Sequence, residues 1–153
     1  MELVSLIQEG TSTVGQVTAL KDAPMPHRIL VIDHDDDARL IVCDRMLQMG
    51  FDAVGEDNGA SGLARIAQAS GDEPFTGVAL ELDMPVLGGM AVLLELRDRY
   101  PDIPVIVMSH SILIHRLRQA VKLGAREYLV KPFDSQLFRI KCLHTFVNGR
   151  DAA

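Results

Sequence analysis

Side chains that can hold charge or bind cations stand directly after four apolar runs of the sequence. They are Asp33, His34 and Asp35 after residues 29–32, Glu81 and Asp83 at the end of residues 76–82, Ser109 and His110 after residues 105–108, and Lys131 after residues 128–130. A carboxylate at the end of a buried strand is costly unless it meets water, a cation or hydrogen-bond donors. Pro85 ends the third run, because proline cannot donate to a strand ladder. The first chemical question is therefore which cation or donor Glu81 faces.

The apolar runs alternate with helical patterns, which is typical of a parallel sheet covered on both faces. We predict strands at residues 29–32, 51–55, 76–82, 105–108 and 128–130, with a helix after each, the fourth over 112–123 and the last over 135–147. Five such units with right-handed crossovers form a doubly wound α/β fold. Ligands of such folds bind beyond the carboxyl ends of the strands, so the polar side chains are expected on one rim.

Apolar positions at helical spacing predict which helix faces point inward. The predicted inward stripe after Asp37 is Leu40, Ile41, Cys43, Met46 and Leu47, and in the fourth helix it is Leu113, Leu117, Ala120 and Val121. Ile112 and Ile114 then lie on the flanks of the fourth helix, beside Arg116 and Arg118. The last helix is apolar over more than one stripe, from Leu137 and Phe138 to Val147. Such surplus apolar surface is expected to cover a second copy, a partner protein or the N-terminal segment.

Composition limits the function classes. The chain has 153 residues, 48% hydrophobic and 24% charged, which is typical of one globular domain. A formal net charge of −6 argues against general nucleic-acid binding, which needs a basic face. No apolar run is long enough to span a membrane, and the N-terminus lacks a signal-peptide pattern. Cys43 and Cys142 are expected to be reduced thiols in a cytoplasmic protein.

Residues 1–26 differ from the rest of the chain. Leu3, Leu6 and Ile7 have helical spacing, and Pro24 and Pro26 mark a boundary. We predict an N-terminal extension at 1–26, made of a short helix and a linker, a domain at 27–148 and a tail at 149–153.

The polar residues also form a set with a known order. Acids after the first strand, an acid four residues before a proline after the third, a hydroxyl ending the fourth and Lys-Pro after the fifth resemble the receiver domain of bacterial two-component response regulators. The resemblance covers residues 27 to 147. It implies a CheY-like, flavodoxin-like sheet in the order 2-1-3-4-5.

The resemblance also implies site roles. In receivers, an aspartate ending the third strand accepts a phosphoryl group from a histidine kinase, and an acidic pair after the first strand holds Mg²⁺. The lysine pairs with the phosphoryl group, the hydroxyl moves in to bond it, and an aromatic residue on the fifth strand reorients. Lys131, Ser109, Tyr128 and Asp33 match these positions.

Three positions depart from the family pattern. Glu81 stands at the phosphoacceptor position, His34 stands at the second acid of the pair, and His110 stands at the pocket mouth where a small residue is usual. The longer side chain of Glu81 displaces the carboxylate, and displacement of this order can lower a rate about a hundredfold. Imidazole suits Mg²⁺ poorly, so Mg²⁺ binding is expected to be weakened or lost, and no cofactor is expected. Asp83, two residues before Pro85, belongs to the acidic pocket and contributes a backbone carbonyl to the metal site in the family.

We therefore expect an atypical receiver that is not an enzyme and acts as a phosphorylation-independent interaction module. A Glu81–Lys131 ion pair would resemble the phosphorylated state, and a hydrogen bond from Ser109 to Glu81 would hold the switch on. One alternative is a working receiver that is phosphorylated on Glu81 or Asp83. A second alternative is a transition-metal sensor built from Asp33 or Asp35 with His34 and Glu81.

The expected partner is a protein, or a second copy of this chain, bound by the fourth helix, fifth strand and fifth helix. Ile112, Arg116, Leu137 and Phe138 are the predicted contact residues of this face. No output domain follows in the sequence, so the domain is expected to act alone or within a longer protein. A histidine kinase stays a possible partner, while nucleic acid and membrane are not expected.

Overall fold

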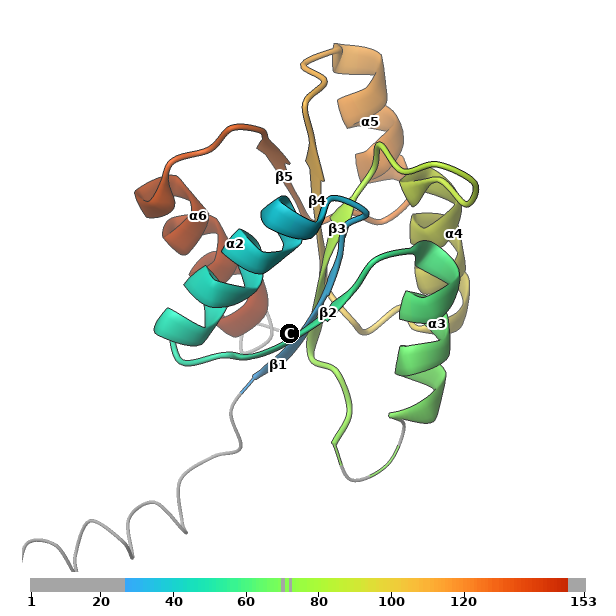
Figure 1. The fold of residues 1–153 in the computed structure, drawn as a ribbon. Helices are drawn as coiled ribbons and strands as arrows, with labels where there is room; N and C mark the ends of the chain where they lie inside the picture. Colours follow the sequence, from blue (N-terminus) through green and yellow to red (C-terminus); the bar gives the residue numbers. More distant parts are fainter. Residues whose placement is uncertain (1–26, 70, 72, 149–153) are drawn as a thin grey trace, which may run out of the picture.

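A five-stranded parallel sheet runs through the molecule, with helices on both of its faces (Figure 1). The computed structural model describes residues 27–69, 71 and 73–148. The strands are β1 (Arg28–Ile32), β2 (Asp52–Glu56), β3 (Gly77–Glu81), β4 (Val105–Ser109) and β5 (Glu127–Val130), in the order β2-β1-β3-β4-β5. The predicted doubly wound α/β fold is confirmed. The predicted extension at 1–26 and tail at 149–153 lie outside the described residues.

The helices divide between the two faces of the sheet (Figure 1). One face is covered by α2 (Asp36–Gln48) and α6 (Ser135–Cys142), which continues as a π-helical turn, η1 (Leu143–Asn148). The other face is covered by α3 (Gly59–Gln68), α4 (Gly89–Arg99) and α5 (Ile114–Lys122). None of the helices described in residues 27–148 is long and apolar enough to cross a membrane.

Alternating side chains of the central strands build a core on each face. Leu30 and Ile32 join Val78, Leu80 and the α4 residues Val92, Leu93 and Leu96 in one cluster. Ile29 and Val31 join Ala79, Ile106, Met46, Phe138 and Phe146 in the other. Every residue of β3 and β4 is buried, which explains why these strands are apolar up to their last residues, Glu81 and Ser109.

The predicted inward stripe of α2 is wrong at three positions. Leu40, Ile41 and Leu47 are exposed, and Val42 and Met46 are the buried residues. Asp35 caps the helix by accepting a hydrogen bond from the Ala38 amide at 2.9 Å, and this start sets the helical phase. The buried positions Val42 and Met46 are four residues apart, as the period of a helix requires.

The predicted inward stripe of α5 is wrong at two of its four positions. Ala120 is the one buried residue of this helix, whereas Leu113 and Val121 are exposed. The helix begins at Ile114, so Leu113 lies in the preceding loop and does not share the helical phase. The consequence is a helix that contributes little to the core.

Phe138 is a further correction, because it was predicted on the interaction face. Its side chain is 1% exposed and stacks on Phe133, with 5.3 Å between ring centroids. Leu137 and Ile140 are the exposed apolar residues of α6. Cys43 and Cys142 are both free, and burial raises the pKa of the Cys142 thiol to about 12, so this thiol stays protonated.

Candidate functional site

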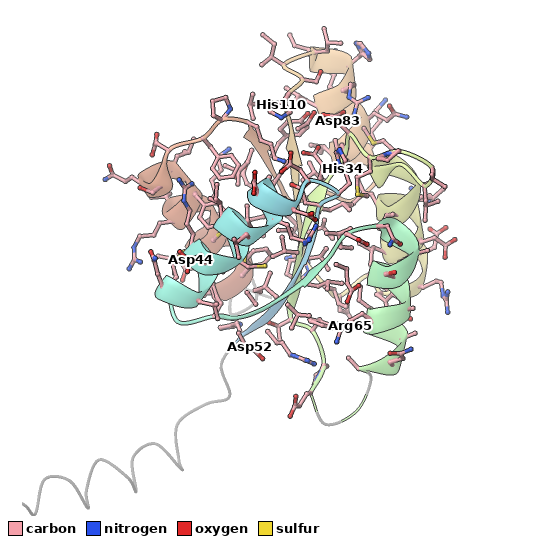
Figure 2. All side chains as sticks on the ribbon, in the orientation of Figure 1. His34, Asp44, Asp52, Arg65, Asp83 and His110 are labelled. Atoms are coloured by element: carbon pink, nitrogen blue, oxygen red, sulfur yellow. The ribbon has the colours of Figure 1, made fainter. Side chains whose placement is uncertain are left out.

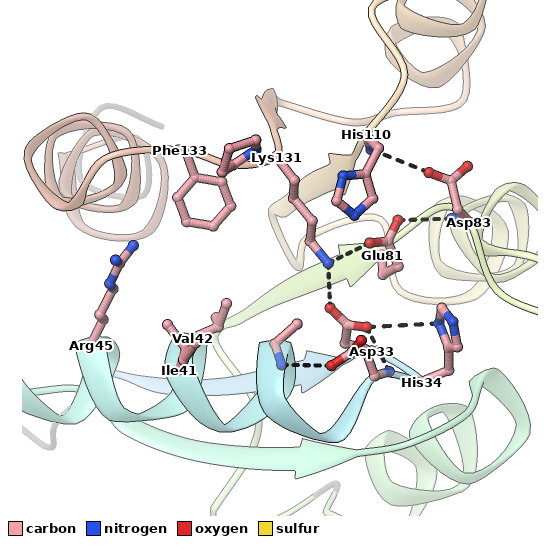
Figure 3. A pocket seen from close by; sticks show the side chains of 13 residues that line it. Asp33, His34, Ile41, Val42, Arg45, Glu81, Asp83, His110, Lys131 and Phe133 are labelled. Atoms are coloured by element: carbon pink, nitrogen blue, oxygen red, sulfur yellow. Dashed lines mark hydrogen bonds and ion pairs between the residues drawn. The ribbon is translucent and has the colours of Figure 1, made fainter.

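Lys131 lies between two buried carboxylates at the carboxyl ends of the strands (Figure 3). Its Nζ is 2.7 Å from Asp33 Oδ2 and 2.5 Å from Glu81 Oε1. Asp33 is fully buried and Glu81 is 1% exposed. Partial burial opposes the charge of Lys131, but its hydrogen bonds to Asp33 and Glu81 outweigh this effect and raise its pKa. The three groups therefore form an ion triad from β1, β3 and the segment after β5.

The start of α2 holds the Asp33 end of this triad. Asp33 Oδ1 accepts a hydrogen bond from the Asp35 amide at 3.0 Å, and the Arg39 guanidinium donates to the Asp33 carbonyl oxygen at 2.8 Å. His34 Nδ1 lies 3.8 Å from Asp33 Oδ1, and the His34 side chain is partly exposed. Asp33 thus has one oxygen on Lys131 and the other on the backbone of the β1–α2 turn.

Glu81 uses both of its oxygens as well. Oε1 faces Lys131, and Oε2 accepts a hydrogen bond from the Asp83 amide at 2.8 Å. The backbone of Glu81 is packed against the start of α4: a Cβ on Gly89 would lie 2.4 Å from the Glu81 carbonyl oxygen. The Glu81 side chain is consequently fixed at its base by α4 and at its tip by Lys131 and Asp83.

Asp83 gathers groups from β4, the following loop and α5. Its Oδ2 accepts from Ser109 Oγ at 2.7 Å and from the His110 amide at 3.3 Å, and its Oδ1 accepts from Arg116 Nη2 at 2.8 Å. Partial burial favours the neutral form of Asp83, but the hydrogen bonds from Ser109 and His110 and the charge of Arg116 together lower its pKa. Asp83 is thus an ionised acceptor for three donors.

Tyr128, on β5, is connected to the site by a hydrogen bond to the loop before α5. Its hydroxyl donates to the Ser111 carbonyl oxygen at 3.2 Å, and the Ser111 amide donates to Ser109 Oγ at 3.0 Å. The ring of Tyr128 packs against the core cluster on the α3–α4 side.

A cavity of about 560 Å³ opens beside the triad. His34, Asp83 and His110 lie together at this end of the molecule, far from Asp52 and Arg65 (Figure 2). The acidic wall of the cavity contains the triad with Asp35 and Asp83, and the wall toward α2 and α6 is made of Ile41, Val42, Arg45, Pro132 and Phe133. The Lys131–Pro132 peptide bond is cis. A volume of this size is in the range of small-molecule sites.

Mg²⁺ fits the observed donors poorly. This hard cation takes oxygen ligands, usually from one or two carboxylates with water. One oxygen each of Asp33 and Glu81 is bound to Lys131, and the other accepts a backbone amide. Within residues 27–69, 71 and 73–148, no group of three or more His, Cys, Asp or Glu side chains is arranged to hold a metal ion.

The structure brings most predicted site residues together and separates a few. Asp33, His34, Asp35, Glu81, Asp83, His110 and Lys131 line one cavity. The hydrogen bond considered from Ser109 to Glu81 is replaced by one to Asp83. Arg116, predicted as a partner-binding residue, has an internal contact with Asp83.

Two features of the site were missed from the sequence. One is the Asp83–Ser109–Arg116 cluster, and the other is the apolar cavity wall of Ile41, Val42 and Phe133. A signal for the first existed. Asp83 and Ser109 both follow apolar runs that were predicted to be parallel strands, and the observed register, with Glu81 beside Met108, places Asp83 near the start of the loop after Ser109.

Comparison with known proteins identifies the family. The model of the response regulator receiver domain matches residues 29–141, which is most of the chain. The chain belongs to the response regulator receiver domain family. Receivers are signalling modules of two-component systems rather than classical enzymes, and they typically partner with histidine kinases.

This receiver is similar to several curated proteins. It is 31% identical to the response regulator protein FleR of Pseudomonas aeruginosa over 112 residues, 73% of this chain and 23% of FleR. It is 29% identical to the chemotaxis protein CheY of Bacillus subtilis over 112 residues, 72% of this chain and 90% of CheY. The chain thus spans about a quarter of FleR and most of CheY.

Solved structures show the same fold. A CheY-like receiver domain protein from Methanospirillum hungatei superposes with a TM-score of 0.76 at 18% identity, covering 84% of this chain and all of that one. NtrX from Brucella abortus superposes with a TM-score of 0.76 at 24% identity, covering 84% of this chain and 28% of that one.

Proposed function

We propose that this receiver is a phosphorylation-independent interaction module in which Glu81 replaces a phosphorylated aspartate. The observation that carries the proposal is the buried Glu81–Lys131–Asp33 triad, with 2.5 Å and 2.7 Å between Lys131 Nζ and the two carboxylates. In a phosphorylated receiver the lysine pairs with the phosphoryl group. Here the Glu81 carboxylate, which is always present, pairs with Lys131 instead. This ion pair therefore forms without a kinase.

The geometry of Glu81 also works against phosphoryl transfer. In-line attack needs a free carboxylate oxygen at near-attack distance from the donor. Both oxygens of Glu81 are occupied, one by Lys131 and the other by the Asp83 amide. Breaking these contacts would leave buried charges without partners, which is costly.

The donor set supports weakened or lost Mg²⁺ binding. His34 stands where the family has its second acid, and Asp33 is turned toward Lys131. Without a cation, charge developing on a transferring phosphoryl group would be stabilised by Lys131 alone. We therefore expect this receiver to lack the share of the electrostatic stabilisation that a divalent cation supplies.

We further propose that the surface of α5, β5 and α6 binds a protein or a second copy of the chain. Ile112, Leu113, Ile114, Val121, Leu137 and Ile140 are its exposed apolar residues. Arg118 and Lys122 are exposed beside them, and they favour a partner with acidic groups. A single charge at Ile112 or Leu137 is expected to weaken self-association or partner capture, measured by sedimentation. A monomer at all concentrations with no charge-sensitive partner would contradict this surface.

The phosphorylation test uses acetyl phosphate with Mg²⁺ and intact-mass measurement. The unmodified chain is expected to gain no phosphoryl group. The matched variant carries Glu81→Asp together with His34→Asp, which restores two of the three family residues, and it is expected to gain one phosphoryl group. A phosphoryl gain by the unmodified chain would overturn the proposal and favour a working receiver.

Calorimetry with Zn²⁺ tests the metal-sensor alternative. No binding is expected, because the nearby carboxylate oxygens are already engaged. Binding that disappears in His34→Ala would contradict the interaction-module proposal.

A further inference from the structure

Helix α5 is weakly held by its own residues. Ala120 is its one buried residue, whereas α4 buries four. Leu113 at its N-cap forms no side-chain hydrogen bond, so the helix start has no side-chain cap. Arg116 stands in the first turn, and a cation there opposes the helix dipole. The start of α5 therefore needs a partner from another part of the chain.

Asp83 is the partner that the structure provides. It reaches from the β3–α4 loop to Arg116 Nη2 at 2.8 Å and to Ser109 Oγ at 2.7 Å. It also accepts from the His110 amide at 3.3 Å. One carboxylate thus joins the last residue of β4, the next amide and the first turn of α5.

We propose that Asp83 is a built-in tether of α5, which holds the Ser109 hydroxyl and the Arg116 guanidinium in one arrangement. In the receiver family a single phosphoryl group binds both the lysine and the hydroxyl. In this chain two carboxylates divide those contacts: Glu81 binds Lys131, and Asp83 binds Ser109. The position of α5 is then set by Asp83 and not by a chemical change at Glu81.

The tether is connected at both of its ends. On one side, the Asp83 amide donates to Glu81 Oε2 at 2.8 Å, so the triad orients the loop that carries Asp83. On the other side, Ser109 Oγ accepts the Ser111 amide, and the Ser111 carbonyl accepts the Tyr128 hydroxyl. A hydrogen-bonded path therefore runs from Lys131 to Tyr128 through Glu81, Asp83 and Ser109.

Loss of Asp83 has a specific cost at Arg116. The Arg116 side chain is 30% exposed, and its buried Nε has no hydrogen-bond partner within the described residues. Removing Asp83 would leave this partly buried cation without its close carboxylate, and we expect Arg116 to turn outward and release the first turn of α5.

Hydrogen exchange of the intact chain tests the tether. In Asp83→Ala, amides of residues 110–118 are expected to exchange about tenfold faster, because hydrogen bonds to a charged group are lost. Amides of α4 are expected to keep their rates. Asp98→Ala is the control, since Asp98 is a more exposed acid whose contact is with the neighbouring Arg97. Unchanged exchange at 110–118 in Asp83→Ala would overturn the proposal.

A double-mutant cycle identifies the partner of the hydroxyl. Ser109→Ala is expected to speed exchange of the α5 amides in the unmodified chain and to have little further effect in Asp83→Ala, because the two residues share one bond. Arg116→Gln removes the charged donor to Asp83 from the α5 side and should also speed the exchange of the amides of residues 110–118. A Ser109→Ala effect of equal size in both backgrounds would contradict the tether.

The inference rests on the proposed function for the part played by Glu81, but its test is separate. Phosphorylation of the unmodified chain would end the proposed function and leave the Asp83–Ser109 coupling measurable. Absence of that coupling would end the tether and leave the Glu81–Lys131 proposal intact.

Discussion

Helices α4 and α5 cover the same face of the sheet, yet different interactions hold them (Figure 1). Gly89, Val92, Leu93 and Leu96 of α4 are buried, and the helix begins directly on the backbone of Glu81 and Leu82. In α5 the buried set is reduced to Ala120, and Ile114 and Val121 face outward. Its polar anchor is the contact of Arg116 with Asp83.

The difference teaches how one fold can combine a helix held by apolar packing with a helix held by a few polar contacts. Apolar packing is insensitive to small chemical changes at the rim, because its free energy depends on buried area. A helix fixed by a few charged hydrogen bonds responds to any change in those groups. Elements that move in signalling proteins are drawn from the weakly packed parts of a fold, and α5 has these properties.

The strongest test of the comparison is a matched pair of leucine truncations. Leu93→Ala in α4 removes a side chain that is 1% exposed and is expected to lower the free energy of unfolding by about 2–5 kcal/mol. Leu113→Ala, before α5, removes an exposed side chain and is expected to change it by less than about 0.5 kcal/mol. Urea unfolding measures both, and equal losses would show that the residue at the start of α5 is packed as firmly as α4.

Two glycines give a second pair. Gly89→Ala places a Cβ 2.4 Å from the Glu81 carbonyl oxygen and is expected to destabilise the fold by about 2 kcal/mol. Gly124→Ala, after α5, has room but a φ of +102°, and is expected to cost about 1 kcal/mol from backbone strain. Thermal unfolding of both variants checks that Gly89→Ala is the more destabilising change. A tolerated Gly89→Ala would mean that α4 can move away from β3.

The loop before α4 offers a stabilising change. Val86 has a φ of 64° and a fully exposed side chain, a rare conformation for a β-branched residue. Val86→Asn is expected to raise the free energy of unfolding by about 1 kcal/mol, because asparagine tolerates this backbone region. Val86→Ala is the control and should raise it less. Equal stabilities of the two variants would indicate that no strain is relieved.

Helix α6 is held by buried apolar residues and by an ion pair between Lys141 and Glu127. A change of pH alters the ion pair and leaves the apolar packing unchanged. Burial opposes ionisation of Glu127, but hydrogen bonds from Lys141 and the Tyr128 amide and the charge of His144 lower its pKa below 4.5. The stabilisation is therefore present above that pH and is lost as pH falls through the lowered folded-state value. Glu127→Gln should remove about 0.5 kcal/mol at neutral pH and flatten the acid side of the stability profile.

The pH prediction has an internal control. Lys141→Met removes the other partner of Glu127, which lies 2.9 Å away, and should flatten the same part of the profile. The double variant should add little to either single change. Unfolding midpoints measured between acidic and neutral pH supply the comparison, and fully additive effects would show that the pair does not act as a unit.

Much of the fold was predictable from the sequence, because parallel strands buried on both faces require apolar runs. Residues 29–32, 78–80 and 105–108 have no polar side chain, and the structure buries all of them. Helix faces were less predictable. Met46 faces the sheet as predicted, but Val42 joins it while Leu40 and Leu47 are exposed, because the cap at Asp35 sets where the helix starts. Phe138 was similarly misplaced, since the sequence does not state which of two apolar stripes meets the core.

By itself, the sequence determined the parallel α/β architecture and the rim on which Asp33, Glu81, Ser109 and Lys131 meet. Strand direction and alternation are local properties, and the carboxyl ends of parallel strands necessarily share an edge. Only the tertiary structure decided that Ser109 donates to Asp83 rather than Glu81, and that Arg116 turns inward. Those choices depend on side-chain rotamers and loop positions between segments distant in the chain, where several donors compete for each carboxylate within a few ångströms.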